Sequence, residues 1–365
     1  MDESIQLSSN SFIATFDEHA TPEALAEIAQ ITGKAEAQEE LAPGVLLVHS
    51  SQSFAHVAHL WRERPPVFIR HICPVQRTVP LNGGGDTVAA ITAAALQICA
   101  DAVPVDQPFS VQTRVLDEVG FKPYDVNTAV AQAVAQATGA GVDVRNPQQV
   151  VSVVCAGGQT SGSELAEATA YVGLSAVEDN LSDWAGGMRR FAREQGQVSR
   201  SEFKLLEALD VFGIELQPRG VALDLGAAPG GWTRVLRQHS LYVTAVDPGD
   251  LHPSIRSDSG VRRLKLTAEE YLSRGPDRFD LIVNDMRMDG RDSSRLMARY
   301  AEYLYADGQA IMTLKLPERN RSAVMDHSLT ILAAAYDILG VKQLFHNRSE
   351  VTVHLKRHDA YRDGS

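Results

Sequence analysis

VALDLGAAPGGW, at residues 221–232, carries the strongest structural signal in the sequence. Its apolar start predicts a buried strand, and the glycines that follow predict a tight loop that opens a helix. Glycine lets the backbone come close to a ligand, and the first turn of a helix leaves N–H groups free to bind one. The segment therefore predicts a ligand-binding loop at the carboxyl end of a strand.

The kind of ligand follows from the residues in and after this loop. Ala228 stands where the dinucleotide fingerprint G-x-G-x-x-G requires its second glycine. The loop thus favours the carboxylate-bearing methionine end of S-adenosylmethionine over a pyrophosphate. Asp247 ends the next apolar run, VTAVD, where a carboxylate can bind the ribose hydroxyls of an adenosine.

Residues 199–365 alternate between strand-like and helix-like runs, which predicts an α/β fold. The last two expected strands follow each other without a helix and predict an antiparallel hairpin. We therefore expect a Rossmann-like domain with a mostly parallel, seven-stranded sheet and an antiparallel last strand. The expected strands cover 221–225, 241–246, 261–266, 280–284, 309–315, 341–345 and 350–356.

The first half of the chain predicts two smaller α+β units. Strand-like and helix-like runs occupy 12–72 and again 87–195. LNGGGD, at 81–86, is the best linker candidate between them. The expected domains are therefore 1–80, 81–195 and 196–365.

The composition is that of a globular protein, with 44% hydrophobic and 22% charged residues. The net charge of −12 lies in residues 1–199, because 23 Lys and Arg from Arg200 onward balance 23 Asp and Glu. This acidity weakens the case for RNA binding, but a neutral second half can carry a local basic face. Three separated cysteines and scattered histidines predict no disulfide framework and no metal site. We expect no signal peptide and no membrane span, which favours the cytoplasm.

Ionisable residues at strand ends form the second signal. Asp285 and Lys315 end the fourth and fifth expected strands, where doubly wound sheets place their ligand crevice. Glu350 begins the last expected strand. Together these positions predict a cluster of charges around one crevice.

A helix start supplies a fourth ionisable residue. Ser199 and Glu202 have the spacing of a capping box. The helix would begin near Ser201 and carry Lys204 in its first turn.

Five segments together resemble those of ribose 2′-O-methyltransferases that use a Lys-Asp-Lys-Glu tetrad: SRSEFKLLEA, DLGAAPGGW, VND, LKLP and RSEVTVHLK. The sequence is most similar to the bacterial enzymes that methylate a cytidine of large-subunit ribosomal RNA. Those enzymes join a ferredoxin-like domain and an RNA-binding THUMP domain to an FtsJ-like methyltransferase domain. The resemblance implies S-adenosylmethionine as cofactor and RNA as partner. It is specific over about the last 165 residues and rests on domain order and size before them.

The resemblance also implies roles for individual residues. The tetrad would be Lys204, Asp285, Lys315 and Glu350, with Lys315 as general base. The cofactor contacts would fall in and around the glycine-rich loop and at neighbouring strand ends: Ser201, Gly226, Ala228, Pro229, Gly230, Gly231, Trp232, Asp247, Thr267 and Asp285. The chain departs from the family pattern at Thr267, where an acidic residue usually contacts the adenine. Glu269 is the other candidate for that contact.

The expected mechanism centres on one lysine. A ribose hydroxyl is a poor nucleophile and has to lose its proton as it attacks a sulfonium methyl group. A free lysine, with a pKa of about 10.4, is almost fully protonated at pH 7. Burial and the nearby cation Lys204 would lower the pKa of Lys315, whereas adjacent carboxylates would raise it. Asp285 and Glu350 would orient the amines and the hydroxyl.

Other classes fit less well or stay open. A cytosine C5-methyltransferase needs a nucleophilic cysteine near the fourth or fifth strand, and no cysteine follows Cys155. An exocyclic-amine methyltransferase usually resembles (N/D)-P-P-(Y/F) where this chain reads NDMR. A nicotinamide oxidoreductase would need the missing fingerprint. A non-catalytic RNA-binding or assembly factor with a methyltransferase fold stays an alternative. The target nucleotide and the oligomeric state stay open. The loop 287–299 holds four arginines that suit either phosphate contacts or a solvated helix face.

Overall fold

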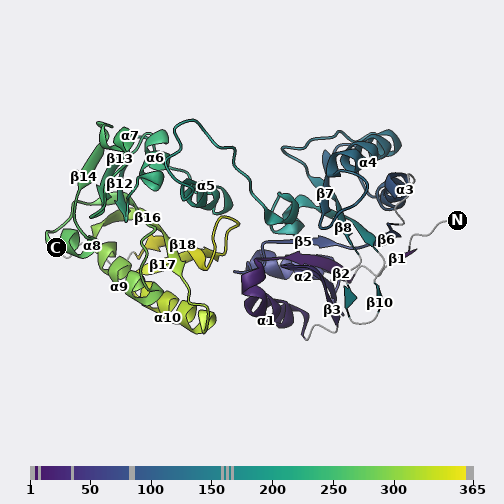
Figure 1. Ribbon diagram of the computed structural model, residues 1–365, viewed down its shortest axis with the longest axis horizontal. Coiled ribbons are helices and arrows are strands. Elements are labelled where there is room, and N and C mark those ends of the chain that lie inside the picture. Colours follow the sequence, from purple (N-terminus) through teal and green to yellow (C-terminus); the bar gives the residue numbers. More distant parts are fainter. Residues whose placement is uncertain are drawn as a thin grey trace. The chain divides into compact units, whose positions relative to one another are not determined.

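The computed structural model describes residues 5–6, 10–33, 37–81, 87–157, 160–161, 164–165 and 168–358. The chain divides into two compact units, Met1–Met188 and Arg189–Ser365. In Figure 1 the first unit runs from purple to teal and the second from teal to yellow. Residues 82–86 of the expected linker lie outside the described residues. The division into three domains stays a prediction.

The first unit contains a four-stranded antiparallel sheet with the strand order β3-β4-β2-β5. Two helices join its strands in the order β-α-β-β-α-β, which is the ferredoxin-like arrangement. The elements are β2 (Ser11–Thr15), η1 (Glu18–Ala20), α1 (Thr21–Thr32), β3 (Ala37–Ala42), β4 (Val45–His49), α2 (Phe54–Glu63) and β5 (His71–Pro74).

A second sheet in this unit has the order β1-β6-β11-β8-β7, with β7 and β8 parallel. Helices α3 and α4 pack on it through a core of aliphatic side chains that includes Ile91, Val130 and Val153. A separate apolar cluster joins residues of both sheets, among them Ile13 and Val154. The elements are β1 (Ile5–Gln6), β6 (Arg77–Pro80), α3 (Thr87–Cys99), β7 (Phe109–Val115), α4 (Pro123–Thr138), β8 (Gln149–Ala156), β9 (Thr160–Ser161), β10 (Glu164–Leu165), β11 (Thr169–Ala176), η2 (Val177–Asn180) and η3 (Ala185–Gly187).

The second unit is a seven-stranded sheet with the order β14-β13-β12-β15-β16-β18-β17. Strands β12 to β16 are parallel, and β18 runs antiparallel to both β16 and β17. The expected Rossmann-like α/β sheet is therefore confirmed. Its strands are β12 (Val221–Leu225), β13 (Tyr242–Val246), β14 (Val261–Leu264), β15 (Phe279–Asn284), β16 (Leu304–Lys315), β17 (Tyr336–Lys342) and β18 (Glu350–Arg357).

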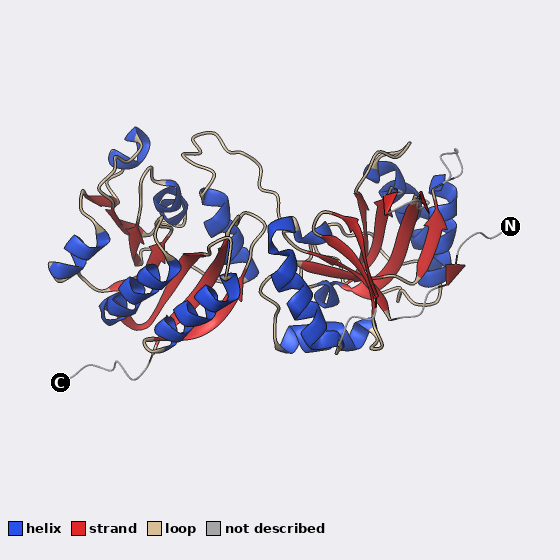
Figure 2. Ribbon diagram, turned by 60° about the horizontal axis from the view of Figure 1, so that its bottom comes forward, coloured by secondary structure: helices blue, strands red, loops and turns tan. Residues whose placement is uncertain are grey.

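Helices cover both faces of this sheet (Figure 2). Leu205 and Leu236, from α5 and α6, share an apolar cluster with Val283 and Ile311 of the strands. The opposite face meets α9, where Gly290 packs on Leu314. The helices are α5 (Glu202–Val211), α6 (Gly231–Gln238), α7 (Pro253–Arg256), α8 (Ala268–Ser273), α9 (Gly290–Tyr300), η4 (Ala301–Tyr303) and α10 (Arg321–Ala333).

The strand order fixes where a ligand can lie. After β12 the chain adds β13 and β14 on one side and then crosses to add β15 on the other. Such a switch point opens a crevice beyond the carboxyl ends of the two central strands. In this unit that position lies next to the loop after β12 and the residues after β15, and we call it the crevice.

One strand differs in place from its expectation. We expected 341–345, but β17 ends at Lys342. Leu344 lies beyond it, buried in the core against α5 and α6. Leu344 is thus buried without being part of a strand, so the apolar pattern of this stretch led to the wrong strand bounds.

Candidate active site

The four residues of the predicted tetrad meet in the structure. Lys315 ends β16 and lies opposite Glu350 in the antiparallel pairing with β18, so the two side chains share one face. The Lys315 ammonium bonds to Glu350 Oε2 and, at 2.8 Å, to Asp285 Oδ1. Lys204 Nζ, from α5, lies 2.5 Å from Glu350 Oε1 and 3.2 Å from Asp285 Oδ1. Two amines and two carboxylates therefore alternate in one cluster.

Thr313 belongs to the same cluster, although it was not among the residues predicted from the sequence. Its hydroxyl donates to Asp285 Oδ1 at 2.6 Å and accepts from Lys315 Nζ at 2.9 Å. Thr313 precedes Lys315 by two positions in β16, and strand residues two apart point to the same face. This period of two is the sequence signal that could have identified it.

Burial and ion pairing compete in setting the pKa values of the cluster. The four side chains are between 7% and 24% exposed. Burial alone would lower the pKa of Lys315, but Asp285 and Glu350 outweigh it, so its pKa lies above the ordinary value. Burial likewise would raise the pKa of Asp285, but Lys315 and Lys204 outweigh it and lower that pKa. The carboxylates thus dominate the balance at Lys315 that the sequence analysis left open.

The start of α5 differs in detail from the expected capping box. The helix begins at Glu202 with Ser201 as N-cap, and the Ser201 side chain makes no capping bond. Glu202 does reach back to accept the N–H of Ser199 at 3.1 Å, but the Ser199 hydroxyl bonds to that of Ser201. Lys204 lies in the first helical turn, as predicted.

The glycine-rich loop packs against the segments that carry the tetrad. Gly226 has φ +76°, and a Cβ added there would lie 2.6 Å from the Met286 side chain. A Cβ on Gly231 would lie 2.2 Å from the Ser199 hydroxyl. The loop therefore touches the residue after Asp285 and the segment before α5, and no larger side chain fits at these glycines.

The residues around this loop fit S-adenosylmethionine. Gly226, Ala228 and Pro229 keep exposed surface at the crevice, and the Ala228–Pro229 peptide bond is cis. The half-buried Asp247 carboxylate accepts the N–H groups of Ala228 (3.1 Å) and Gly249 (2.6 Å). A carboxylate for ribose hydroxyls and a loop beside a helix N-terminus thus lie at one end of the sheet.

Three other predicted cofactor residues are buried at the start of α6. Gly230 and Gly231 are buried at the start of α6. The Trp232 ring is buried in the core, and its indole N–H donates to the Ser201 carbonyl at 2.8 Å. Whether Trp232 also contacts the cofactor stays a prediction.

The predicted adenine contact falls at the start of α8. The Thr267 hydroxyl accepts the N–H of Glu270 at 3.2 Å, and Glu270 accepts the N–H of Thr267 at 2.9 Å. This capping box occupies the Thr267 side chain. Glu269 is exposed in the first turn of the same helix.

Asp224 supports the loop from below. It is buried in β12, and the Thr233 hydroxyl of α6 donates to it at 2.6 Å. Burial raises the pKa of Asp224 to about 7 against the opposing effect of this hydrogen bond. The pair fastens the first turns of α6 to the central strand.

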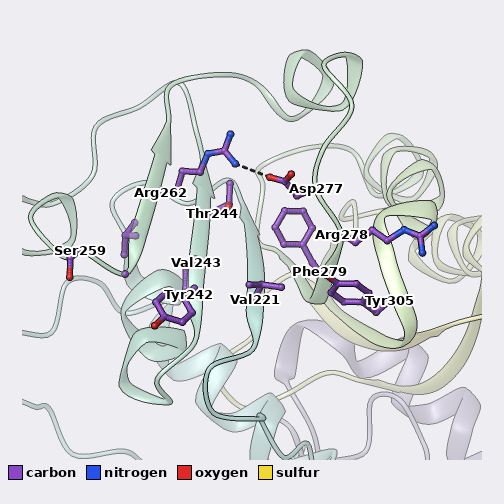
Figure 3. Close-up of a pocket in the computed structure, with 12 residues that line it drawn as sticks. Val221, Tyr242, Val243, Thr244, Ser259, Arg262, Asp277, Arg278, Phe279 and Tyr305 are labelled. Carbon is purple, nitrogen blue, oxygen red and sulfur yellow. Dashed lines mark hydrogen bonds and ion pairs between the residues drawn. The ribbon is translucent and has the colours of Figure 1, made fainter.

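A second hollow, of about 430 Å³, lies at the opposite edge of the sheet (Figure 3). It is lined at the amino ends of β12, β13 and β15 by side chains that include Tyr242, Arg262 and Phe279. No tetrad residue lines it. The crevice at the carboxyl ends, and not this hollow, is the candidate active site.

Two negative findings apply to the described part of the chain. No group of three or more His, Cys, Asp or Glu there is placed to hold a metal ion. None of the helices in that part combines the length and apolar character needed to cross a membrane.

Comparison with known families assigns classes to the two units. Residues 197–324 match the FtsJ-like methyltransferase family, and residues 86–161 match the THUMP domain. These two matches confirm the resemblance to FtsJ-like methyltransferases and to THUMP domains that the sequence shows.

Individual relatives make the comparison more specific. The chain is similar to proteins named "Ribosomal RNA large subunit methyltransferase M". It is 39% identical over 178 residues to the one from Alkalilimnicola ehrlichii, which covers 47% of this chain and 49% of that protein. It is 35% identical over 177 residues to the one from Halorhodospira halophila, which covers 48% and 51%. The chain thus spans about half the length of the curated relatives it matches.

A solved structure matches over most of the chain but weakly. TrmN from Thermus thermophilus gives a TM-score of 0.41 at 17% identity, over 95% of this chain and 99% of that chain. This likeness is too low to support a conclusion.

Proposed function

We propose that this protein transfers a methyl group from S-adenosylmethionine to a ribose 2′-hydroxyl of RNA. The convergence of Lys204, Asp285, Lys315 and Glu350 on one crevice, next to the glycine-rich loop, carries the proposal. Bound S-adenosylmethionine supplies an electrophilic methyl group on a sulfonium. The loop at 226–231 and Asp247 would hold it.

Lys315 is the proposed general base. In the described state its three N–H bonds have three acceptors, which are Asp285, Glu350 and Thr313. This is the ammonium form. Lys315 has to release a proton to solvent, and with it one of these bonds, before Nζ can accept the proton of the ribose hydroxyl.

The other tetrad members position this amine. Asp285 and Glu350 fix Nζ from two sides, and Lys204 holds both carboxylates. General-base assistance is typically worth about 10²- to 10⁴-fold, and alignment of the reactants contributes a larger share. We therefore assign most of the acceleration to placement of the hydroxyl.

The substrate is proposed from the relatives. The name of these relatives refers to the ribosomal RNA of the large subunit, and the THUMP match supports an RNA partner. A cytidine target and action in the cytoplasm are finer parts of the same proposal.

A methyl-transfer assay tests the function. The full chain is incubated with labelled S-adenosylmethionine and protein-free ribosomal RNA from cells that lack the protein, and the RNA is digested to nucleosides. We expect label in a 2′-O-methylnucleoside, which also identifies the base. Lys315→Ala should lower the rate at least about a hundredfold without loss of cofactor binding.

Lys356→Ala is the matched control, because Lys356 lies on β18 at the far end from Glu350 and, among the residues that the structure describes, pairs only with Asp307 at the surface. Tight cofactor binding with no transfer to any RNA would favour the non-catalytic alternative. Near wild-type turnover in Lys315→Ala would refute the base assignment.

A further inference from the structure

The tetrad offers no net charge to its substrate. Its two amines lie within 3.3 Å of its two carboxylates, so the four formal charges cancel. Every internal ribose of RNA is flanked by two phosphates, and phosphate contacts supply much of the affinity of nucleic-acid-binding proteins. Cations for these phosphates have to come from residues around the tetrad.

Each segment that supplies a tetrad residue also carries an exposed arginine. This arginine lies two to four positions along the chain from the tetrad residue of its segment. One precedes α5, one follows β15, one follows β16 and one precedes β18: Arg200, Arg287, Arg319 and Arg348. We name these four residues the arginine rim.

The rim side chains have no hydrogen-bond or ion-pair partner among the residues that the structure describes. The neighbouring arginines of α9 differ, because Arg291 pairs with Asp289 and Arg295 with Asp292. A paired arginine has to give up its carboxylate before it can bind a phosphate. The rim arginines are available without that cost.

We propose that the arginine rim binds the two phosphates that flank the target ribose and thereby holds the 2′-hydroxyl at Lys315. A guanidinium matches a phosphate with two parallel N–H bonds, which fixes direction as well as distance. The four arginines lie on the four segments that supply the tetrad, so together they can hold both phosphates while the tetrad stays neutral. This inference rests on the proposed function, because it takes RNA as the substrate.

The test compares removal of the rim with removal of a similar arginine elsewhere. The four rim residues are changed together to glutamine, which keeps length and polarity. Arg219→Gln is the matched control, because Arg219 is also exposed but lies two residues before β12, at the opposite edge of the sheet. Binding of the full chain to protein-free large-subunit ribosomal RNA is measured by filter binding over a series of salt concentrations.

We expect the quadruple variant to bind RNA at least about tenfold more weakly at low salt. Its slope of log affinity against log salt should be shallower by about 1.4, which corresponds to two phosphates at about 0.7 each on a single strand. Arg219→Gln should change neither. Glu318→Gln removes the one acid of residues 316–320 and should strengthen binding.

The proposal for the arginine rim would be overturned if the quadruple variant kept the wild-type salt slope, or if it lost no more RNA affinity than Arg219→Gln. Methyl transfer is measured on the same samples, and cofactor binding should be equal in all variants. Because the salt slope needs no turnover, a wild-type protein that binds RNA but transfers no methyl group would defeat the proposed function and leave the rim supported. A wild-type protein that does not bind RNA would overturn both.

Discussion

Lys315, the proposed general base, combines two properties that such a base does not usually share. It is largely buried, yet Asp285 and Glu350 keep its pKa above the ordinary value. The cluster therefore favours the protonated form of the amine. Removing a carboxylate should make the amine easier to deprotonate.

This reasoning predicts a shift in the pH dependence of the rate. A base acts only when it is neutral, so the single-turnover rate should rise by about tenfold per pH unit below the pKa of Lys315. Glu350→Gln removes one carboxylate that raises this pKa, so its profile should lie at lower pH than that of the wild type. Single-turnover rates between about pH 6.5 and 9.5 measure the shift.

Glu302→Gln serves as the control, because Glu302 is an exposed carboxylate in η4. Its profile should coincide with that of the wild type. A Glu350→Gln profile at higher pH, or one that does not move, would contradict the proposed origin of the Lys315 pKa.

At the scale of elements, the conformation of the proposed cofactor loop depends on how α6 and α7 pack against each other. Gly230 is the N-cap of α6 with φ +115°, and a Cβ there would lie 2.9 Å from the Ile255 side chain. Gly275 also has a positive φ, of +70°, but nothing lies within 4 Å of its position. Comparing Gly230 with Gly275 therefore separates the free-energy cost of a positive φ from the cost of the clash with Ile255.

Gly230→Ala should therefore destabilise the protein more than Gly275→Ala does. We expect about 1–3 kcal/mol for the backbone strain and a further loss from the clash with Ile255. Only Gly230→Ala should also weaken binding of S-adenosylmethionine. Denaturant unfolding and calorimetric titration measure the two effects, and equal losses of stability in both variants would show that the Ile255 contact is unimportant.

The strands of the second unit could be predicted because buried parallel strands are continuous apolar runs between glycine-rich loops. The tetrad could be placed because its members stand where those runs begin or end. β3 could not be predicted, since it is an edge strand whose residues 38–40 are all exposed and show no alternation. The cap before α5 could not be predicted in detail, because Glu202, which accepts the N–H of Ser199, also binds Arg234 of α6 at 2.7 Å. No local sequence pattern reveals a partner from another helix.

At the scale of the whole molecule, the two units have separate cores. The apolar cluster of α5, α6 and the central strands contains no residue of the first unit. All four tetrad residues and the cofactor loop also belong to the second unit. The proposed active site and its scaffold therefore lie within residues 189–365.

A fragment of residues 189–365 should fold and bind S-adenosylmethionine within about threefold of the full chain, because all the proposed cofactor contacts belong to that unit. Its methyl transfer to ribosomal RNA should be weaker if the THUMP domain helps to bind the substrate. Circular dichroism, calorimetric titration and the transfer assay test these expectations on matched samples. A fragment that does not fold would show that the second unit depends on the first.

The direct pairing of Lys315 with Glu350 across β16 and β18 has an evolutionary consequence. Insertions in the connection between these strands leave the pairing intact, so that region is open to change in length. A single inserted or deleted residue within either strand would instead turn the amine and the carboxylate to opposite faces of the sheet. Tolerated insertions or deletions inside β16 and β18 should therefore comprise even numbers of residues. Aligned sequences of related proteins that keep the activity should show gaps of even length in these strands.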